Sequence, residues 1–181
     1  MKNLLYFCIF YNEKYINLSN LLLSSLKKFG NIENNTDILI CTSVDFKKNI
    51  ENNEIIQELN VKFFTFEANS LYEACSSRLR IFNYKNINRY EKILYIDTDI
   101  LITGNLNKIF NLNIEEKLYA VEEFGSRKWH YFLWKKEKLR WLPKNAFSTG
   151  VLLFLNCDKI KELFQETYNH IQTHMKEKKK M

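Results

Sequence analysis

The sequence predicts an α/β fold with a mostly parallel central sheet flanked by helices. Short apolar runs of strand length alternate with stretches whose apolar residues recur at helical spacing, which is the order of elements in such folds. With 181 residues, of which 46% are hydrophobic and 15% aromatic, the chain is large and apolar enough for a folded core. Because no internal repeat or linker stands out, we expect one domain over residues 1–175 and a basic tail over residues 176–181.

The expected strands are apolar runs, and a short apolar piece at residues 101–102 follows the fourth of them. The runs are Leu4–Phe10, Asp37–Thr42, Val61–Phe66, Lys92–Asp97, Leu118–Phe124 and Phe147–Leu155. Ligands of parallel sheets bind beyond the carboxyl ends of the strands. Residues 10–12, 42–45 and 97–99 are therefore the expected edges of a site.

The expected helices lie between these strands. The clearest begins at Tyr15, has apolar residues at spacings of three and four up to Phe29, and is ended by Gly30. The others are Phe46–Leu59, Leu71–Ile87, a short helix around Leu106–Phe110, and Asp158–Met175.

Composition excludes several classes of protein. Four glycines cannot form the glycine-rich fingerprint of dinucleotide-binding folds, and no P-loop is present. No apolar run approaches the ~20 residues that cross a bilayer, and no cleavage site follows the first apolar run. The four cysteines are scattered without a CxxC pair, which argues against a zinc or disulfide framework and favours a cytoplasmic protein.

The acidic turn Asp97-Thr98-Asp99 directly follows a buried strand. In extended chain, residues two apart project to the same side, so the two carboxylates can converge on one hard cation and leave positions for a diphosphate. A cation held in this way neutralises charge on a departing phosphate. The alternative is that one Asp caps the turn and the other faces water. The strand before the turn and the apolar strand expected after it, at residues 101–102, favour the metal.

The run from Tyr90 to Phe110 (YEKILYIDTDILITGNLNKIF) resembles the signature stretch of glycosyltransferase family 8, which includes glycogenin and bacterial lipopolysaccharide galactosyltransferases. The resemblance extends from residue 4 to about residue 165. It implies a GT-A fold, here shortened at its C-terminal end, a UDP-sugar donor, Mn²⁺ or Mg²⁺ as cofactor, and hexosyl transfer with retention at the anomeric carbon.

The resemblance also implies roles for residues near the first and fourth strands. Asp97 and Asp99 would be metal ligands, and Thr98 would lie against the ribose. Asn12 and Tyr15 match the family's Asn and Tyr after the first strand, where the Tyr stacks on uracil, and Phe10 precedes them. The structural alternative, which is compatible with binding, is that Asn12 caps the helix and Tyr15 packs against it.

Further donor-binding residues are expected on either side of this turn. One basic residue near the diphosphate is expected from Arg78 or Arg80: the spacing to Asp97 favours Arg80, and the local Arg-Leu pattern favours Arg78. An acidic residue near the donor sugar is expected at Glu122 or Glu123. In the Phe-Asn-Ser-Gly motif of the family, Ser148 stands where Asn is usual, and Gly150 could instead serve close backbone approach.

Two later motifs of the family are missing from this chain. They are an Asp-Gln pair and a His-x-x-Gly-x-x-Lys-Pro-Trp segment that completes the metal site. His170 and His174 have a metal-binding spacing but share a polar terminal helix, so we expect them to be exposed, and His130 lies among aromatic residues. No catalytic residue can be assigned. The alternative function is therefore a UDP-sugar-binding domain with little or no activity.

Residues 126–144 combine seven cationic side chains with five aromatic ones. They contribute +6 and residues 176–180 contribute +3 to a net charge of +6, so the rest of the chain is slightly acidic. The segment is interpreted as a surface helix or as a lid that contacts a glycan, protein or lipid acceptor. Nucleic acid or an anionic membrane surface is a less favoured partner.

Overall fold

The computed structural model describes residues 1–123 and 146–178, which form a six-stranded sheet covered by helices on both faces. The sheet order is β3-β2-β1-β4-β6-β5. Strands β1 to β4 are parallel, and β6 runs antiparallel to both β4 and β5. The strands are β1 (Lys2–Ile9), β2 (Thr36–Thr42), β3 (Lys62–Thr65), β4 (Tyr90–Ile96), β5 (Tyr119–Glu123) and β6 (Ala146–Leu155). The predicted α/β class with a mostly parallel sheet is confirmed.

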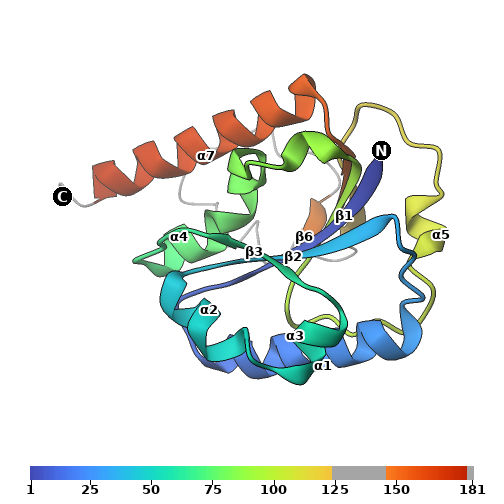
Figure 1. Ribbon diagram of the computed structural model, residues 1–181. Coiled ribbons are helices and arrows are strands. Elements are labelled where there is room, and N and C mark those ends of the chain that lie inside the picture. The colour runs from blue at the N-terminus through green and yellow to red at the C-terminus, as the bar shows by residue number, and fades with distance from the viewer. Residues whose placement is uncertain (124–145, 179–181) are drawn as a thin grey trace.

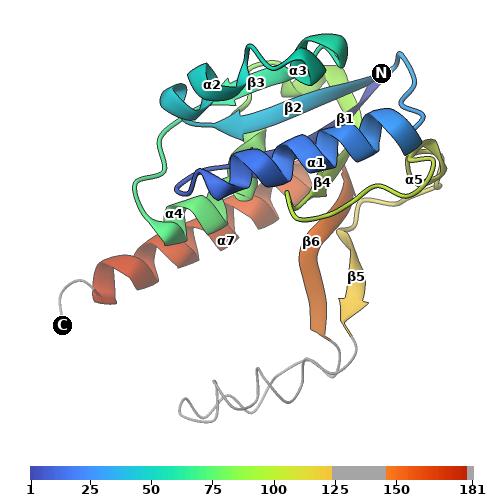
Figure 2. The ribbon, with the colours of Figure 1, turned by 90° about the horizontal axis from the view of Figure 1, so that it is seen from below.

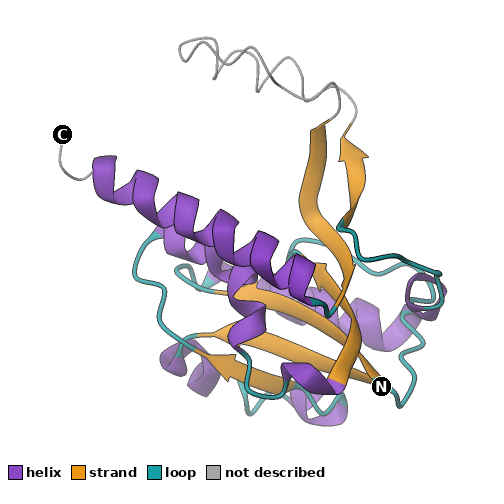
Figure 3. Ribbon diagram, turned by 90° about the horizontal axis from the view of Figure 1, so that it is seen from above, coloured by secondary structure: helices purple, strands orange, loops and turns teal. Residues whose placement is uncertain are grey.

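The helices divide between the two faces of the sheet (Figure 1). On one face lie α1 (Lys14–Phe29), α2 (Val44–Ile50) and α3 (Glu54–Glu58). On the other face lie α4 (Leu71–Ser76) and the long helix α7 (Asp158–Lys178), which crosses the sheet in Figure 3. The short helix α5 (Asn107–Phe110) stands at the side of the sheet.

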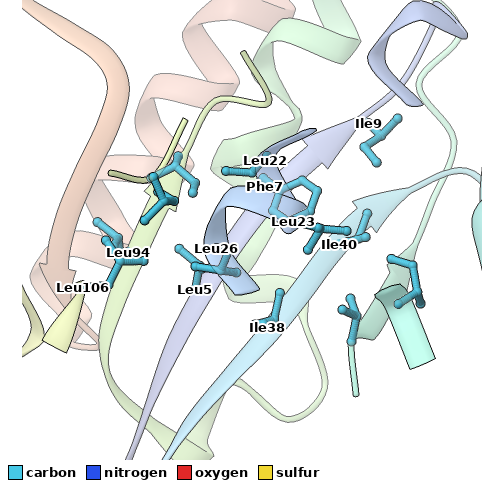
Figure 4. Close-up of a cluster of buried hydrophobic side chains, with 14 of the residues drawn as sticks. Leu5, Phe7, Ile9, Leu22, Leu23, Leu26, Ile38, Ile40, Leu94 and Leu106 are labelled. Carbon is cyan, nitrogen blue, oxygen red and sulfur yellow. The ribbon is translucent and has the colours of Figure 1, made fainter. Parts of the chain in front are cut away.

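The central strand β1 is apolar along its length because it is buried on both faces. Leu5 and Phe7 point into the core under α1, and the alternate residues Leu4 and Tyr6 point into the core under α7. Figure 4 shows the first of these cores, where three leucines of α1 pack on β1, β2 and β4. The two cores include Ile9 and Phe10 at the carboxyl end of β1 and Tyr95 and Ile96 at that of β4, so packing holds these strand ends in place.

Two expected helices are interrupted. Residues 46–59 form α2 and α3, because the Asn53 side chain accepts a hydrogen bond from the Ile55 amide at 3.1 Å and starts a new helix. Residues 71–87 are α-helical only as far as Ser76 and continue as a 3₁₀ helix, η1 (Ser77–Asn83). The Ser77 hydroxyl donates to the Ala74 carbonyl at 2.6 Å where the helix type changes, a local bond of the kind that competes with α-helical pairing.

The apolar piece at residues 101–102 is not a strand. The amide of Ile102 donates to the Ser25 hydroxyl at 2.9 Å, and the amide of Leu106 donates to the Gly30 carbonyl at 2.9 Å. The backbone amides of Ile102 and Leu106 are therefore satisfied by α1 and by the residue that follows it, without pairing to a strand.

Candidate functional site

A pocket opens at the carboxyl ends of β1 and β4. It lies between the first turn of α1, the helix α4 and the acidic turn after β4. Its lining residues are Cys8, Phe10, Tyr11, Tyr15, Leu71, Ala74, Cys75, Arg78, Tyr95, Asp97, Thr98 and Asp99. Two of the three expected site edges, at residues 10–12 and 97–99, therefore meet in one place, whereas residues 42–45 are not among the lining.

Asp97 is fixed by three neighbours. Its amide donates to the Gly150 carbonyl at 2.8 Å, and its Oδ1 accepts a hydrogen bond from the Tyr95 hydroxyl. The same oxygen lies 3.3 Å from Nη1 of Arg78. The carboxylate nevertheless keeps 34% of its side-chain surface exposed toward solvent, so it remains accessible to a ligand.

Arg78 is held in place from several sides. Its guanidinium lies 4.7 Å from the centre of the Tyr95 ring, and its Nη1 and Nε donate to the carbonyls of Thr149 (2.7 Å) and Cys75 (3.2 Å). Burial by itself would lower the pKa of Arg78, but its interactions with Tyr95 and Asp97 outweigh this and raise the pKa. Arg78 is thus a permanent positive charge in the lining of the pocket.

Tyr95 is a protonated donor in this arrangement. Burial raises the pKa of its hydroxyl well above the ordinary value, and the Asp97 carboxylate raises it further. The hydroxyl therefore keeps its proton at neutral pH and donates a hydrogen bond to Asp97. Because Tyr95 and Asp97 are two residues apart in an extended chain, they project to the same side, so the sequence already contained a signal for this contact.

A large bulge in β6 places backbone carbonyls at the site. Ala120 of β5 is opposite Leu152, but the next residue, Val121, is opposite Ser148, so residues 149–151 have no partner on β5. The carbonyls of Thr149 and Gly150 in this bulge are those that bond Arg78 and Asp97. A Cβ atom on Gly150 would lie 3.1 Å from Oδ2 of Asp97, so a larger residue here would displace this carboxylate by a few tenths of an ångström.

The other predicted residues near the turn are arranged as follows. Thr98 is buried and Asp99 is exposed, and both line the pocket. The Ser148 hydroxyl accepts from the Gly150 amide at 3.2 Å and thus supports the bulge. Phe10 and Tyr15 line the pocket, whereas the Asn12 side chain accepts from the Lys14 amide at 2.9 Å just before α1, whose N-cap residue is Glu13.

Several predicted residues do not reach the pocket. Arg80 turns away: its guanidinium lies 4.0 Å from the centre of the Phe66 ring, and its Nη1 donates to the Glu67 carbonyl at 3.3 Å. The geometry thus favours Arg78, contrary to the preference that spacing gave to Arg80. Glu122 is exposed in the β5–β6 hairpin and is not among the lining residues, and Glu123 is the last residue of β5 (Figure 2).

Of the histidines, the structure describes His170 and His174, and neither lines the pocket. Both are exposed on α7, as expected. His130 and the basic aromatic segment 126–144 lie outside the described residues.

The carboxylates of the acidic turn suit a hard divalent cation. Asp97 and Asp99 supply carboxylate oxygens, the ligands that Mg²⁺ and Mn²⁺ prefer, to the lining of the pocket. Within residues 1–123 and 146–178, no three His, Cys, Asp or Glu side chains cluster as a metal site. A cation held here would need further oxygen ligands, which a diphosphate and water can provide.

Comparison with known proteins identifies the family. Residues 8–181 match the family described as Glycosyl transferase family 8. The chain belongs to this family. A comparison with curated proteins gave no match. In the part of the chain that the structure describes, no helix is both long enough and apolar enough to cross a membrane.

The solved structures that resemble this glycosyltransferase family 8 chain are GT-A fold glycosyltransferases, which confirms the predicted fold. GlyE of Streptococcus pneumoniae TIGR4 is 20% identical with a TM-score of 0.57, and the match covers 100% of this chain and 39% of GlyE. The galactosyltransferase LgtC, solved with donor and acceptor sugar analogues, is 16% identical with a TM-score of 0.63, over 93% of this chain and 66% of LgtC. Mouse xyloside xylosyltransferase 1 is 16% identical with a TM-score of 0.62, over 96% of this chain and 74% of that one. The chain thus spans about two fifths of the length of GlyE.

Proposed function

We propose that this protein binds a UDP-sugar together with Mn²⁺ or Mg²⁺ and transfers the hexosyl group to an acceptor with retention. The observation that carries the proposal is the division of one pocket into an aromatic end and a charged end. The aromatic end is defined by Phe10 and Tyr15, from the end of β1 and the start of α1, and the charged end by Arg78, Asp97 and Asp99, from η1 and the turn after β4. A nucleoside diphosphate has the same division, with a flat base at one end and anionic phosphates at the other.

In this proposal, the charged end binds the diphosphate. Asp97 and Asp99 would hold the divalent cation, which supplies neutralisation of the charge that develops on the leaving UDP. Arg78 contributes a second positive charge whose position is set by two backbone carbonyls and the Tyr95 ring. Because these partners fix the guanidinium before any ligand arrives, little reorganisation is needed when the phosphate binds.

The aromatic end binds the base. Tyr15 keeps 38% of its surface exposed while it lines the pocket, so its ring is free to stack on uracil. Thr98, which is buried and lines the pocket, is the residue that family resemblance assigns to the ribose.

The parts of the proposal that concern retention, hexosyl specificity and the acceptor rest on membership of glycosyltransferase family 8. A glycan, protein or lipid acceptor is proposed to contact residues 126–144, which connect β5 to β6. A cytoplasmic location is also proposed, and the four free cysteine thiols support it because thiols persist in reducing compartments.

Binding and turnover are tested separately. Isothermal titration calorimetry of UDP with Mn²⁺ should give binding that EDTA abolishes, and incubation with a panel of UDP-hexoses should release UDP from at least one. Absence of metal-dependent UDP binding would overturn the proposal. Binding without UDP release from any sugar would instead favour a UDP-sugar-binding domain without activity, which remains the alternative function.

A further inference from the structure

Tyr11 has a backbone conformation that tyrosine rarely adopts. Its φ is 70°, and the amide of Asn12 donates to the carbonyl of Phe10 at 2.8 Å across it. This is a γ-turn of the positive-φ kind, which is uncommon and strained. In the described residues, the other non-glycine residues with positive φ are Asn31 and Asn60, of a type that tolerates this region. Tyr11 therefore needs a separate explanation.

The turn is fixed from both sides. Phe10 is buried at the end of β1 and its ring lies 4.8 Å from that of Phe66. On the other side, the Asn12 carbonyl accepts from the Tyr15 amide at 3.0 Å, and the Asn12 side chain accepts from the Lys14 amide. The strand end and the helix start thus hold Tyr11 in its strained conformation, as surrounding structure does where strain serves a site.

The side chain of Tyr11 contributes little to the core. It is 59% exposed, and yet it lines the same pocket as Tyr15. Packing does not explain why an exposed tyrosine occupies a conformation that glycine would adopt without strain. Its place in the pocket explains it, because the turn adds the ring of Tyr11 to that of Tyr15 among the lining residues.

We propose that Tyr11 is a nucleotide-affinity residue that stacks on the base of the UDP-sugar together with Tyr15. This inference rests on the proposed function, since it presupposes a nucleotide in the pocket. Aromatic stacking on a base depends on the flat face of the base and not on the phosphates or the metal. The contribution of Tyr11 should therefore be the same for UMP and UDP, and should persist when the metal is removed.

The test measures the Kd of UMP and of UDP with Mn²⁺, and of UMP with EDTA, for the wild type and four variants. Tyr11→Ala should weaken all three by the same factor, roughly 5- to 100-fold, which corresponds to the usual range for loss of a stacked ring. Tyr11→Phe keeps the ring and should bind within about threefold of the wild type. Tyr72→Ala is the matched control, because Tyr72 is also 59% exposed and nearby on α4 but is not among the lining residues.

Tyr11→Gly separates binding from folding. Glycine accepts a φ of 70° without strain, so this variant should keep or raise the melting temperature while it loses nucleotide affinity as Tyr11→Ala does. If wild type binds UMP and UDP and the Ala and Gly variants bind equally well, the role of Tyr11 is wrong and the proposed function stands. If the wild type binds neither nucleotide, both are wrong.

Discussion

At the scale of single residues, a tyrosine hydroxyl bonds a carboxylate at each end of β4. Tyr95 donates to Asp97 in the pocket, and Tyr90 donates to Asp37 at 2.8 Å near the amino ends of the parallel strands. The chemistry is the same at both ends, but only the first carboxylate belongs to the proposed metal site. The two tyrosines are therefore a matched pair for separating positioning of a ligand from general stability.

Tyr95→Phe should weaken metal-dependent UDP binding by about 10- to 100-fold, because groups that orient a metal ligand contribute on that order. Tyr90→Phe should leave this affinity unchanged. Calorimetric titration of Mn²⁺ and UDP into each variant measures the effect, and thermal melts record the cost to folding. Equal loss of affinity in both variants would show that Tyr95 acts only through stability.

Gly150→Ala should disturb the same carboxylate from the other side. A Cβ atom at this position would lie 3.1 Å from Oδ2 of Asp97, closer than most real contacts, so the carboxylate must shift. We expect weaker Mn²⁺-dependent UDP binding, by about tenfold or more. Gly104→Ala is the control, because a Cβ atom there meets nothing within 4 Å. The account of the bulge fails if the two alanine variants bind equally.

The choice between the two arginines is a residue-scale fact that the sequence did not contain. Arg78 and Arg80 are the same residue type two positions apart, and the 3₁₀ geometry of η1 and the bulge of β6 decide which one contacts Asp97. The sequence spacing to Asp97 favoured Arg80, whereas the structure brings Arg78 beside Asp97. The sequence also contained no sign of the conformation of Tyr11. A positive φ is expected at Gly or Asn, and a tyrosine does not indicate one.

At the scale of elements, the strands could be predicted closely and the interrupted helices could not. Apolar runs buried on both faces mark β1, β2 and β4 clearly, and their predicted limits differ from the observed ones by a few residues at most. The helix predicted over 71–87 changes type because of local side-chain bonds at Ser76 and Ser77. Such bonds compete with helical pairing in ways that apolar spacing does not reveal.

Asp37 connects four strands near their amino ends, away from the pocket. It lies on β2, its carboxylate pairs with Lys2 of β1 at 3.0 Å and with Lys62 of β3, and it accepts from Tyr90 of β4. Burial alone would raise its pKa, but the hydrogen bonds from Lys62, Lys2 and Tyr90 outweigh burial and lower the pKa. The charged form of Asp37 is therefore the form that stabilises the sheet.

The sign of this shift predicts an acid-dependent loss of stability. Because the folded pKa lies below the unfolded one, the stabilisation is fully present at neutral pH and is lost as the pH falls through the folded pKa. Asp37→Asn should lower the free energy of unfolding at pH 7 by about 1–3 kcal/mol, and the difference from wild type should shrink below pH 4. Urea unfolding at pH 7 and pH 3 measures this, and a difference independent of pH would contradict it.

At the scale of the whole molecule, family and fold could both be predicted from one short stretch. The acidic turn after a buried strand and the run around it indicated glycosyltransferase family 8 and the GT-A fold, and both are confirmed. The pocket needed the fold, because it joins residues from β1, α1, α4, η1 and β4 that are far apart in the sequence. Donor, metal and retention remain proposals that measurements on the protein must test.

The central claim is that Asp97 and Asp99 bind a divalent cation that carries UDP. The most direct measurement is calorimetric titration of UDP with Mn²⁺ into the wild type and into the double variant Asp97→Asn, Asp99→Asn. Asp45→Asn serves as the matched control, because Asp45 is an exposed aspartate that follows the neighbouring strand β2 and does not line the pocket. We predict metal-dependent binding in the wild type and in the control, and its loss in the double variant. Undiminished metal-dependent UDP binding after both aspartates are replaced would contradict the account.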